Sequence, residues 1–485
     1  MKVTAPPVIT TKDQLIYYLG EACVLEHQFM CQYLYAAFSL KKAPDGSCTA
    51  AQFEFVRRWA STLYMIARQE MEHLSIANSI LTAVGGVPVF YHLELPTQSA
   101  WYQSAARASR NADSVPAPCD MPFVFAPFDL TTVRRFCCME SPGFEEVPLP
   151  DRARVLSWCF QNDVGQCPCV TAGLSAALTV TPRFTSLEAP PDTVEPGTVA
   201  ELYAAIDQGL AYLNATLGHE ALFSGHASGQ SEIPSEYQLF LFPICDLTSA
   251  QSAIRMVIQQ GEGLDSPPGS DAHFQLFYDM AVAYEQLLAE DPGFTPANPI
   301  PLDADPYAYS SPVTQAAVRL WQRGYATLLF MLTGYYDRYR PKEWNTYPAL
   351  TAALQMSAIA PLMTMFSRSL GEVVAALPGA PFAAYAGVDL NITQEQLHLL
   401  VDPTQPPYGD VNFYRGRMYE LIDDLAALAA MPGMPANLAD KVTYIAQNMF
   451  RVAGNIGQIY TNGIFPPFNP NIDQPSCPAD TGGCE

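Results

Sequence analysis

Apolar side chains recur at helical spacing in two long segments near the start of the chain, residues 13–40 and 50–84. Successive positions are separated by four and three residues in alternation, which places them on one stripe of an α-helix. In the first segment the stripe contains Leu15, Leu19, Ala22, Glu26, Phe29 and Tyr33. In the second segment it contains Trp59, Leu63, Ile66, Glu70, His73, Ala77 and Ile80. The pattern predicts two long helices that bury these stripes inside a bundle.

Further helices are predicted along the rest of the chain, whereas the period-two alternation typical of strands is scarce. They cover residues 198–217, 248–262, 271–289, 313–336, 348–376, 410–431 and 435–459. The proline- and cysteine-rich segment 85–196 is predicted as an insertion of mixed structure. We therefore predict a mainly α fold in three parts. A bundle at 10–290 contains the insertion, an additional helical region at 305–465 packs on the bundle, and a tail follows at 466–485.

The chain is strongly acidic, with 25 lysine and arginine residues against 48 aspartate and glutamate residues and a formal net charge of −23. Binding of nucleic-acid phosphates needs a basic surface, so this charge argues against nucleic acid as a partner. The longest uncharged run, 344–367, contains Pro348 and Pro361 and is predicted as a buried helix rather than a membrane span. The N-terminal residues lack the apolar stretch of a secretory signal. We expect a cytoplasmic protein that binds no membrane, and homo-oligomerisation is left open.

Twelve cysteines are an unusual number for a protein without a secretory signal. No C-x-x-C occurs, and Cys167 and Cys169 are too close together for the usual zinc site. Buried thiols that pack as small apolar side chains are the favoured interpretation. Disulfide formation stays open as the alternative, in particular for Cys477 and Cys484 in the tail.

Three residues on the two apolar stripes carry chemistry: Glu26 in the first helix, and Glu70 and His73 in the second. An ionised carboxylate on a buried stripe is costly unless it is paired or bound to a cation. Two carboxylates and one imidazole from adjacent helices belong to the donor set of a carboxylate-bridged dimetal site. The alternative is that the two glutamates form ion pairs with arginines of the second helix, namely Arg57, Arg58 or Arg68.

A complete dimetal site needs ligands from two further helices. Glu201 begins the third candidate helix, although its spacing from Thr198 is also that of a capping box. Glu262 ends the next helix and His273 lies in the first turn of the one after it. We predict that these two residues approach one metal ion from either side of the intervening loop. Asp265 is the competing ligand, because it lies at Glu-x-x-Asp spacing from Glu262.

Several stretches of the sequence, taken together, resemble a known family. They are LIYYLGEACVLEHQFMCQYLYAAFSLK, ARQEMEHL, GTVAELYAAI, QGEG, AHFQLFY and MSAIAPLMTMFSRSLGEVVAALP. They look like the ferritin-like domain of iminophenylpyruvate dimer synthases, the bisindole-pathway enzymes that couple two amino-acid-derived imines. The resemblance covers about 10–380 and is most specific over the first 85 residues. It implies a ferritin-like four-helix bundle whose metal ligands are Glu26, Glu70, His73, Glu201, Glu262 and His273.

The bundle and its ligands predict a non-haem dimetal oxidoreductase that uses O₂ or peroxide on a small organic substrate. The substrate is expected to be amino-acid-derived or aromatic, as in natural-product biosynthesis. The two metal ions are expected to be iron, with manganese as the alternative. Five tyrosines of the predicted helices either relay protons or electrons near such a site or, as the favoured interpretation, simply pack in the core: Tyr17, Tyr18, Tyr33, Tyr64 and Tyr203. Two other classes of function stay open, an iron-handling ferroxidase or storage protein and a non-catalytic ferritin-like binding protein.

Overall fold

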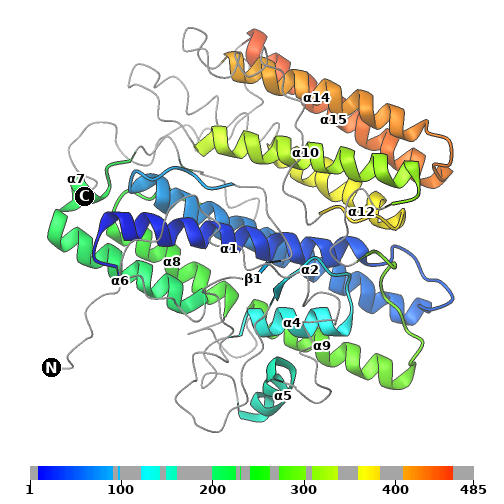
Figure 1. Cartoon of the computed structure of the whole chain (residues 1–485), viewed down its shortest axis with the longest axis horizontal. Coiled ribbons are helices and arrows are strands. Elements are labelled where there is room, and N and C mark those ends of the chain that lie inside the picture. Colours follow the sequence, from blue (N-terminus) through cyan, green and yellow to red (C-terminus); the bar gives the residue numbers. More distant parts are fainter. Residues whose placement is uncertain are drawn as a thin grey trace.

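A computed structural model of the chain describes residues 9–90, 97–98, 122–141, 149–160, 199–225, 230, 241–262, 272–301, 309–336, 359–382 and 408–462. Within these ranges the fold is almost entirely helical, as predicted (Figure 1). The described strands are one antiparallel pair, β1 (Thr97–Gln98) and β2 (Pro122–Phe123). None of the described helices is both long enough and apolar enough to cross a membrane.

Two long helices, α1 (Lys12–Ser39) and α2 (Ala50–Ala83), lie side by side along the long axis of the molecule (Figure 1). Thr11 and Thr49 cap them, because each side chain accepts a hydrogen bond from the backbone N–H three residues later. Such a cap satisfies an N–H group that the first helical turn leaves without a partner. α2 ends just before Gly85, whose φ of 82° is readily adopted only by glycine. Both helices therefore begin and end close to the predicted positions.

The apolar stripes of both helices are buried, as their spacing predicted. Every stripe residue is at most 5% exposed, including the two glutamates and the histidine. Glu21 and His27 lie off the stripe of α1 and are buried as well. The reason is that α10 (Pro312–Tyr336) and α12 (Ser369–Ala376) cover the other side of the central pair. His27 reaches α10, where its Nε2 lies 2.6 Å from the hydroxyl oxygen of Tyr325.

Two rows of shorter helices complete the bundle, and each row is broken near its middle (Figure 1). One row contains α6 (Val199–Leu217) and α4 (Leu130–Met139), and the other contains α8 (Leu247–Gly261) and α9 (His273–Glu290). α6 packs on α1 and α8, α4 packs on α9, and both α8 and α9 contact α2. Helix ends expose backbone groups without helical partners and carry partial charge. The breaks therefore bring polar helix ends to the middle of the bundle.

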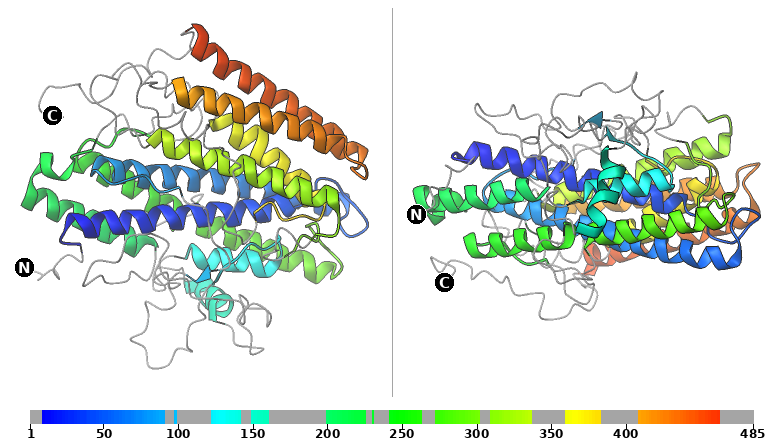
Figure 2. Two further views of the ribbon diagram at one scale, coloured as in Figure 1. Left: turned by 45° about the horizontal axis from the view of Figure 1, so that its top comes forward. Right: turned by 90° about the horizontal axis from the view of Figure 1, so that it is seen from below.

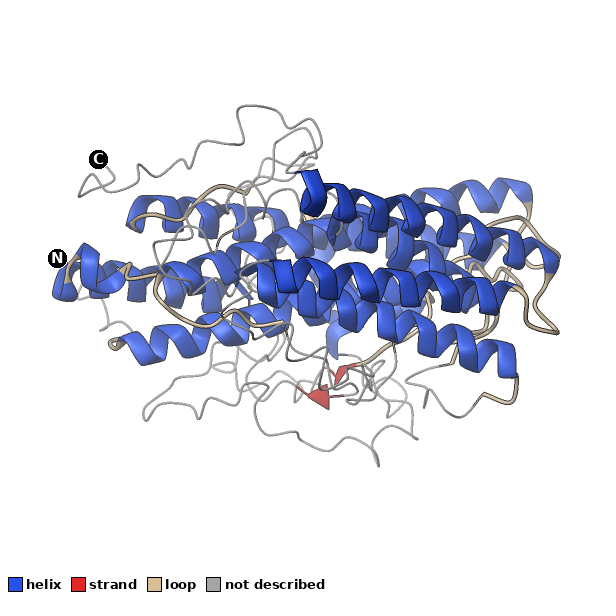
Figure 3. Ribbon diagram, turned by 90° about the horizontal axis from the view of Figure 1, so that it is seen from above, coloured by secondary structure: helices blue, strands red, loops and turns tan. Residues whose placement is uncertain are grey.

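A second layer of helices covers the side of α1 and α2 that faces away from these rows (Figure 2). It contains α10, the π-helical turn η5 (Leu362–Arg368), α12, α14 (Tyr408–Ala429) and α15 (Ala436–Asn462). Seen from above, its long helices run nearly along the bundle axis (Figure 3). Trp321 of α10 packs edge-on against Phe382 with ring centroids 4.4 Å apart, and both rings contact Phe38 of α1. One hydrophobic core spans both layers, and the predicted division between 10–290 and 305–465 stays a prediction.

The described part of the predicted insertion at 85–196 contains α4, the two short strands and α5 (Leu149–Phe160). α5 packs on α4, and its Trp158 contacts Tyr278 of α9. α4 itself is built into the bundle through its contact with α9. The C-terminal part of the helix predicted at 348–376 is described and is helical, and residues 348–358 lie outside the described ranges.

The cysteines whose state the structure describes divide into two groups. Cys23, Cys31, Cys48 and Cys137 are buried free thiols, in agreement with the favoured interpretation. Cys138 and Cys245 are disulfide-bonded instead, so for these two the interpretation as apolar packing groups is wrong. The four cysteines that the sequence analysis singled out, Cys167, Cys169, Cys477 and Cys484, lie outside the described residues.

Candidate metal centre

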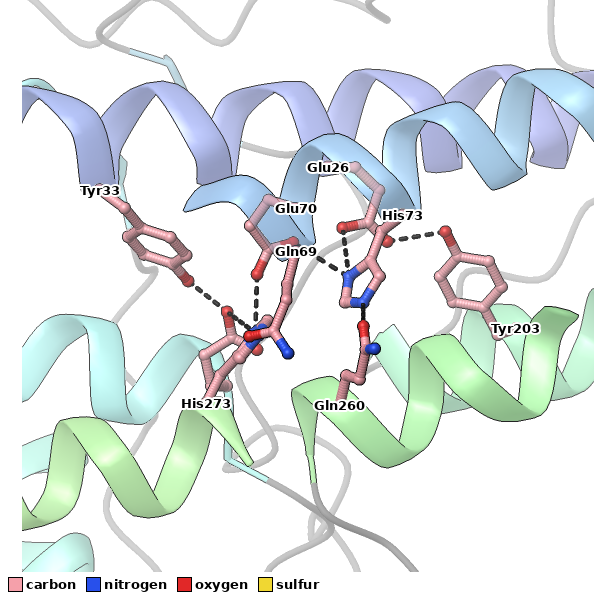
Figure 4. Close-up of polar contacts among 9 residues, drawn as sticks. Glu26, Tyr33, Gln69, Glu70, His73, Tyr203, Gln260 and His273 are labelled. Carbon is pink, nitrogen blue, oxygen red and sulfur yellow. Dashed lines mark hydrogen bonds and ion pairs between the residues drawn. The ribbon is translucent and has the colours of Figure 1, made fainter. Parts of the chain in front are cut away.

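The first candidate ligand group joins α1 to α2 (Figure 4). Glu26, Glu70 and His73 are each at most 2% exposed, and their ligand atoms lie within 4.8 Å of one another. Nδ1 of His73 lies 3.2 Å from Oε2 of Glu70 and 3.6 Å from Oε2 of Glu26. Tyr203 of α6 donates a hydrogen bond of 2.7 Å to Oε1 of Glu26. Two carboxylates and an imidazole at this spacing are able to share one cation.

The second candidate ligand group uses the same Glu70 together with Glu140 and His273. Glu140 is the C-cap of α4 and His273 is the first residue of α9, so two helix ends supply this group. Nδ1 of His273 lies 2.7 Å from Oε1 of Glu70 and 3.6 Å from Oε1 of Glu140. Tyr33 of α1 donates a hydrogen bond to Oε1 of Glu140. Because Glu70 presents one oxygen to each histidine, it is positioned to bridge two cations.

The contact between Glu70 and His273 is not a hydrogen bond, despite its length of 2.7 Å. Within the described residues, neither Oε1 of Glu70 nor Nδ1 of His273 has a hydrogen-bond partner. Buried polar atoms normally find such partners, and two that approach closely without one are arranged like two ligands of the same ion. Three buried carboxylates also concentrate negative charge that two divalent cations would compensate. The residues present therefore fit a pair of metal ions.

Burial and mutual charge shift the pKa values of these groups. Burial raises the pKa of Glu26 to about 8, although His73 opposes the shift. Burial also raises the pKa of Glu140. Burial acts in the same direction on Glu70, but the charges of His273 and His73 outweigh it and lower its pKa. Burial would lower the pKa of His273, but the carboxylates of Glu70 and Glu140 outweigh it and raise the pKa to about 9. Without metal, a proton on His273 therefore supplies positive charge between the two carboxylates at neutral pH.

Four of the six predicted ligands, Glu26, Glu70, His73 and His273, fall in the two groups. The two groups do not include Glu201, which is exposed in the first turn of α6. The capping box that was the other explanation for Glu201 requires Thr198, which lies outside the described residues.

Glu262 is buried, but it also belongs to neither group. It is the C-cap of α8, and its Oε1 accepts a hydrogen bond of 2.7 Å from the backbone N–H of Ala200 at the start of α6. In this arrangement Glu262 and His273 do not share one set of ligand atoms, so their predicted approach to one ion stays a prediction. The competing ligand Asp265 lies outside the described residues.

Sequence reasoning missed three residues that the structure brings to this centre: Glu140, Gln69 and Gln260. Phe136 and Val133 lie four and seven positions before Glu140, and this apolar spacing places Glu140 on the buried face of a short helix. That spacing was the available signal for Glu140. The two glutamines contact the histidines from outside the ligand groups, and their sequence positions carry no comparable signal.

The contacts bear on two alternatives that the sequence analysis left open. Of the five tyrosines considered, Tyr33 and Tyr203 contact the carboxylates, whereas Tyr64 donates a hydrogen bond to a glutamate of α12. Ion pairing with arginines does not account for the buried glutamates within the described part of the chain. Arg57 instead pairs with Glu54 at 3.3 Å on the exposed face of α2.

Comparisons with known proteins show which family and which relatives the chain is similar to. A family model described as Ferritin-like matches residues 19–282, which is more than half of the chain. The chain is 27% identical to 2-imino-3-(indol-3-yl)propanoate dimerase of Chromobacterium violaceum over 79% of its own length and 34% of that protein. It is 22% identical to dichlorochromopyrrolate synthase of Lentzea aerocolonigenes over 80% of its own length and 36% of that protein. The chain thus spans about a third of the length of these curated relatives.

A crystal structure of a ferritin-like protein from Caulobacter vibrioides is similar to the chain with a TM-score of 0.45 and 17% identity, over 79% of this chain and all of that one. The resemblance to the ferritin-like, bisindole-biosynthesis type of protein that the sequence predicted is confirmed by the family model and the two curated relatives. The predicted fold class, a mainly α ferritin-like bundle with insertions and additional C-terminal helices, is confirmed with it. The chain belongs to the ferritin-like family.

Proposed function

We propose that this protein is a dimetal oxidoreductase that uses O₂ or peroxide on a small organic substrate. The observation that carries the proposal is the shared carboxylate of Glu70, with one oxygen beside each of two buried histidines. A bridged pair of cations needs such a carboxylate at its centre. We propose iron as the metal, with manganese as the alternative, because both accept mixed carboxylate and imidazole ligands.

The chain's own residues would hold and orient the two ions. Glu26 and His73 would bind one ion and Glu140 and His273 the other, with Glu70 between them. When bound, the metal pair supplies the redox chemistry that amino-acid side chains lack. The hydroxyl groups hydrogen-bonded to the two outer carboxylates fix the orientation of these carboxylates and hold protons beside the ligands. Every ligand is at most 3% exposed, so bulk water is largely excluded from the centre.

The relatives suggest the class of substrate. One is named for the dimerisation of an indolyl imino acid and the other for the synthesis of dichlorochromopyrrolate. Because the chain spans only about a third of each relative, we propose the class alone: an amino-acid-derived or aromatic molecule. We also propose a small-molecule substrate in place of a nucleic-acid or membrane partner, and a cytoplasmic location.

The test is oxygen consumption by protein loaded anaerobically with Fe²⁺, measured with and without an indolyl imino acid generated in the reaction vessel. We expect substrate-dependent consumption and a new coupled or oxidised product by mass spectrometry. Metal-free protein and Glu70→Gln protein are the controls, and both should be inactive. Oxygen consumption that follows added Fe²⁺ through many equivalents and forms a mineral would replace the proposal with a ferroxidase or storage function. Wild-type protein that binds no metal would favour a non-catalytic binding protein.

A further inference from the structure

Each histidine of the centre faces different groups with its two ring nitrogens (Figure 4). Nδ1 of His73 faces the carboxylates of the first ligand group, whereas its Nε2 lies 2.8 Å from Oε1 of Gln260. Nδ1 of His273 faces the carboxylates of the second ligand group, whereas its Nε2 lies 3.1 Å from Oε1 of Gln69. The same pattern therefore occurs at both histidines, with a carboxamide oxygen on the ring nitrogen that points away from the ligands.

The two glutamines reach across the bundle to histidines on other helices. Gln260 lies in the last turn of α8 and contacts His73 on α2. Gln69 lies on α2, directly before Glu70, and contacts His273 at the start of α9. Glu70 and Gln69 thus approach opposite nitrogens of the same imidazole from neighbouring positions of one helix. This arrangement leaves little freedom for rotation of either ring.

An amide oxygen only accepts hydrogen bonds, so each Nε2 must carry the hydrogen. In a neutral imidazole the lone pair then lies on Nδ1, the nitrogen that faces the carboxylates. Outer partners of metal-bound histidines are commonly carboxylates or carbonyls, and a carboxylate makes the ligand more basic. A neutral amide fixes the same tautomer without adding negative charge to the imidazole.

We infer that Gln69 and Gln260 are positioning residues of the dimetal centre, which set the tautomer of the two histidines and make both neutral Nδ1 ligands that are less basic than histidines with a carboxylate as outer partner. The inference rests on the proposed dimetal function. A less basic ligand stabilises the oxidised metal less. With glutamines as the outer partners of the histidines, the reduction potential of the metal pair would therefore lie above that of a centre in which carboxylates take their place.

The experiment compares Gln260→Glu, Gln260→Leu and the matched controls Gln259→Glu and Gln259→Leu in the full chain. Gln259 is adjacent on α8 and is exposed. Co²⁺ is used as the probe for affinity and for its d–d absorption spectrum, and the iron-loaded protein for its midpoint potential. Gln260→Leu should weaken Co²⁺ binding at one of the two positions by roughly 10–100-fold. Gln260→Glu should retain binding, change the Co²⁺ spectrum and lower the midpoint potential. The Gln259 variants should match the wild type.

Unchanged Co²⁺ affinity, spectrum and potential in both Gln260 variants would overturn the inference and leave Gln260 as an ordinary interhelical hydrogen bond. A loss of thermal stability with no change in these three properties would overturn the inference as well. The isosteric Gln260→Glu variant keeps the test valid if Gln260→Leu fails to fold. His73→Ala separates the two levels of the proposal. If it does not lower Co²⁺ binding, the dimetal function itself fails. If it abolishes binding at one position while Gln260→Leu has no effect, only the positioning role fails.

Discussion

Glu140→Gln should remove one of the two metal ions and leave the other in place. The change neutralises one of the two carboxylates of the second ligand group and leaves Glu70 and His273. The first ligand group does not contain Glu140, so it keeps all of its members. Loss of a group that only hydrogen-bonds to a metal ligand typically lowers the affinity for the metal by about 10–100-fold, and loss of the ligand itself should lower it more. We expect binding at least about 100-fold weaker at this position, or about 2.7 kcal/mol.

The assay is elemental analysis combined with calorimetric titration of the metal-free protein, in which the stoichiometry should fall from two ions per chain to one. The substituted amide can still accept the hydrogen bond of Tyr33, and it removes a buried carboxyl group whose pKa burial raises. The metal-free variant should therefore be no less stable than the wild type in urea. Glu290→Gln, at the exposed end of α9, is the matched control and should bind two ions. Two tightly bound ions in Glu140→Gln would refute the assignment of this residue.

Three further predictions follow from the same contacts. In metal-free protein the pKa of His273 is raised to about 9, so its protonated form stabilises the fold. This stabilisation is fully present below the pKa of 6.5 in the unfolded chain and is lost as the pH rises through 9. The contribution of His273 to the free energy of unfolding in urea should fall by about 3 kcal/mol over this window, and the raised pKa of Glu26 adds to the fall. A flat profile would contradict the assigned charges. Tyr203→Phe should weaken the binding of one metal ion by roughly 10–100-fold, because Glu26 loses its 2.7 Å hydrogen bond. The control Tyr64→Phe should leave the affinity for both ions unchanged. Alkylation of unfolded, unreduced protein should label the four buried free thiols and spare the two described disulfide-bonded cysteines. Full labelling of both Cys138 and Cys245 would contradict their disulfide bonds and indicate the reduced state expected of a cytoplasmic protein.

The helices were predictable because most of the stability of a bundle comes from burial of one periodic face. The segment predicted at 50–84 is α2 at 50–83, and its stripe is buried as expected. Glu26, Glu70 and His73 could be identified for the same reason, because the periodicity of a long regular helix determines which residues share its buried face. Once the neighbouring helix is known, the distance between such residues depends little on loops.

Glu140 was missed although the apolar spacing of α4 places it on a buried face, and Gln260 has no such signal. The contacts of both residues depend on where short helices end. Glu140 is the C-cap of a helix of ten residues, and it meets His273 only because α4 packs on α9. The sequence analysis placed Glu262 at the end of the helix predicted at 248–262 and predicted it as a metal ligand. The helix ends at Gly261 instead, so Glu262 turns to the backbone of α6 and Gln260 contacts the histidine. Helix ends differ by one or two residues between assignments.

Anomalous X-ray diffraction from crystals of the Fe²⁺-loaded protein tests the dimetal centre most directly. We predict two anomalous peaks, one beside Glu26 and Nδ1 of His73 and the other beside Glu140 and Nδ1 of His273, with Glu70 bound to both. Ligand distances of about 2.0–2.3 Å are expected for nitrogen and oxygen donors. A single peak, or two peaks at other residues while both histidines keep their direct contacts with Glu70, would contradict the shared carboxylate on which the proposed function rests.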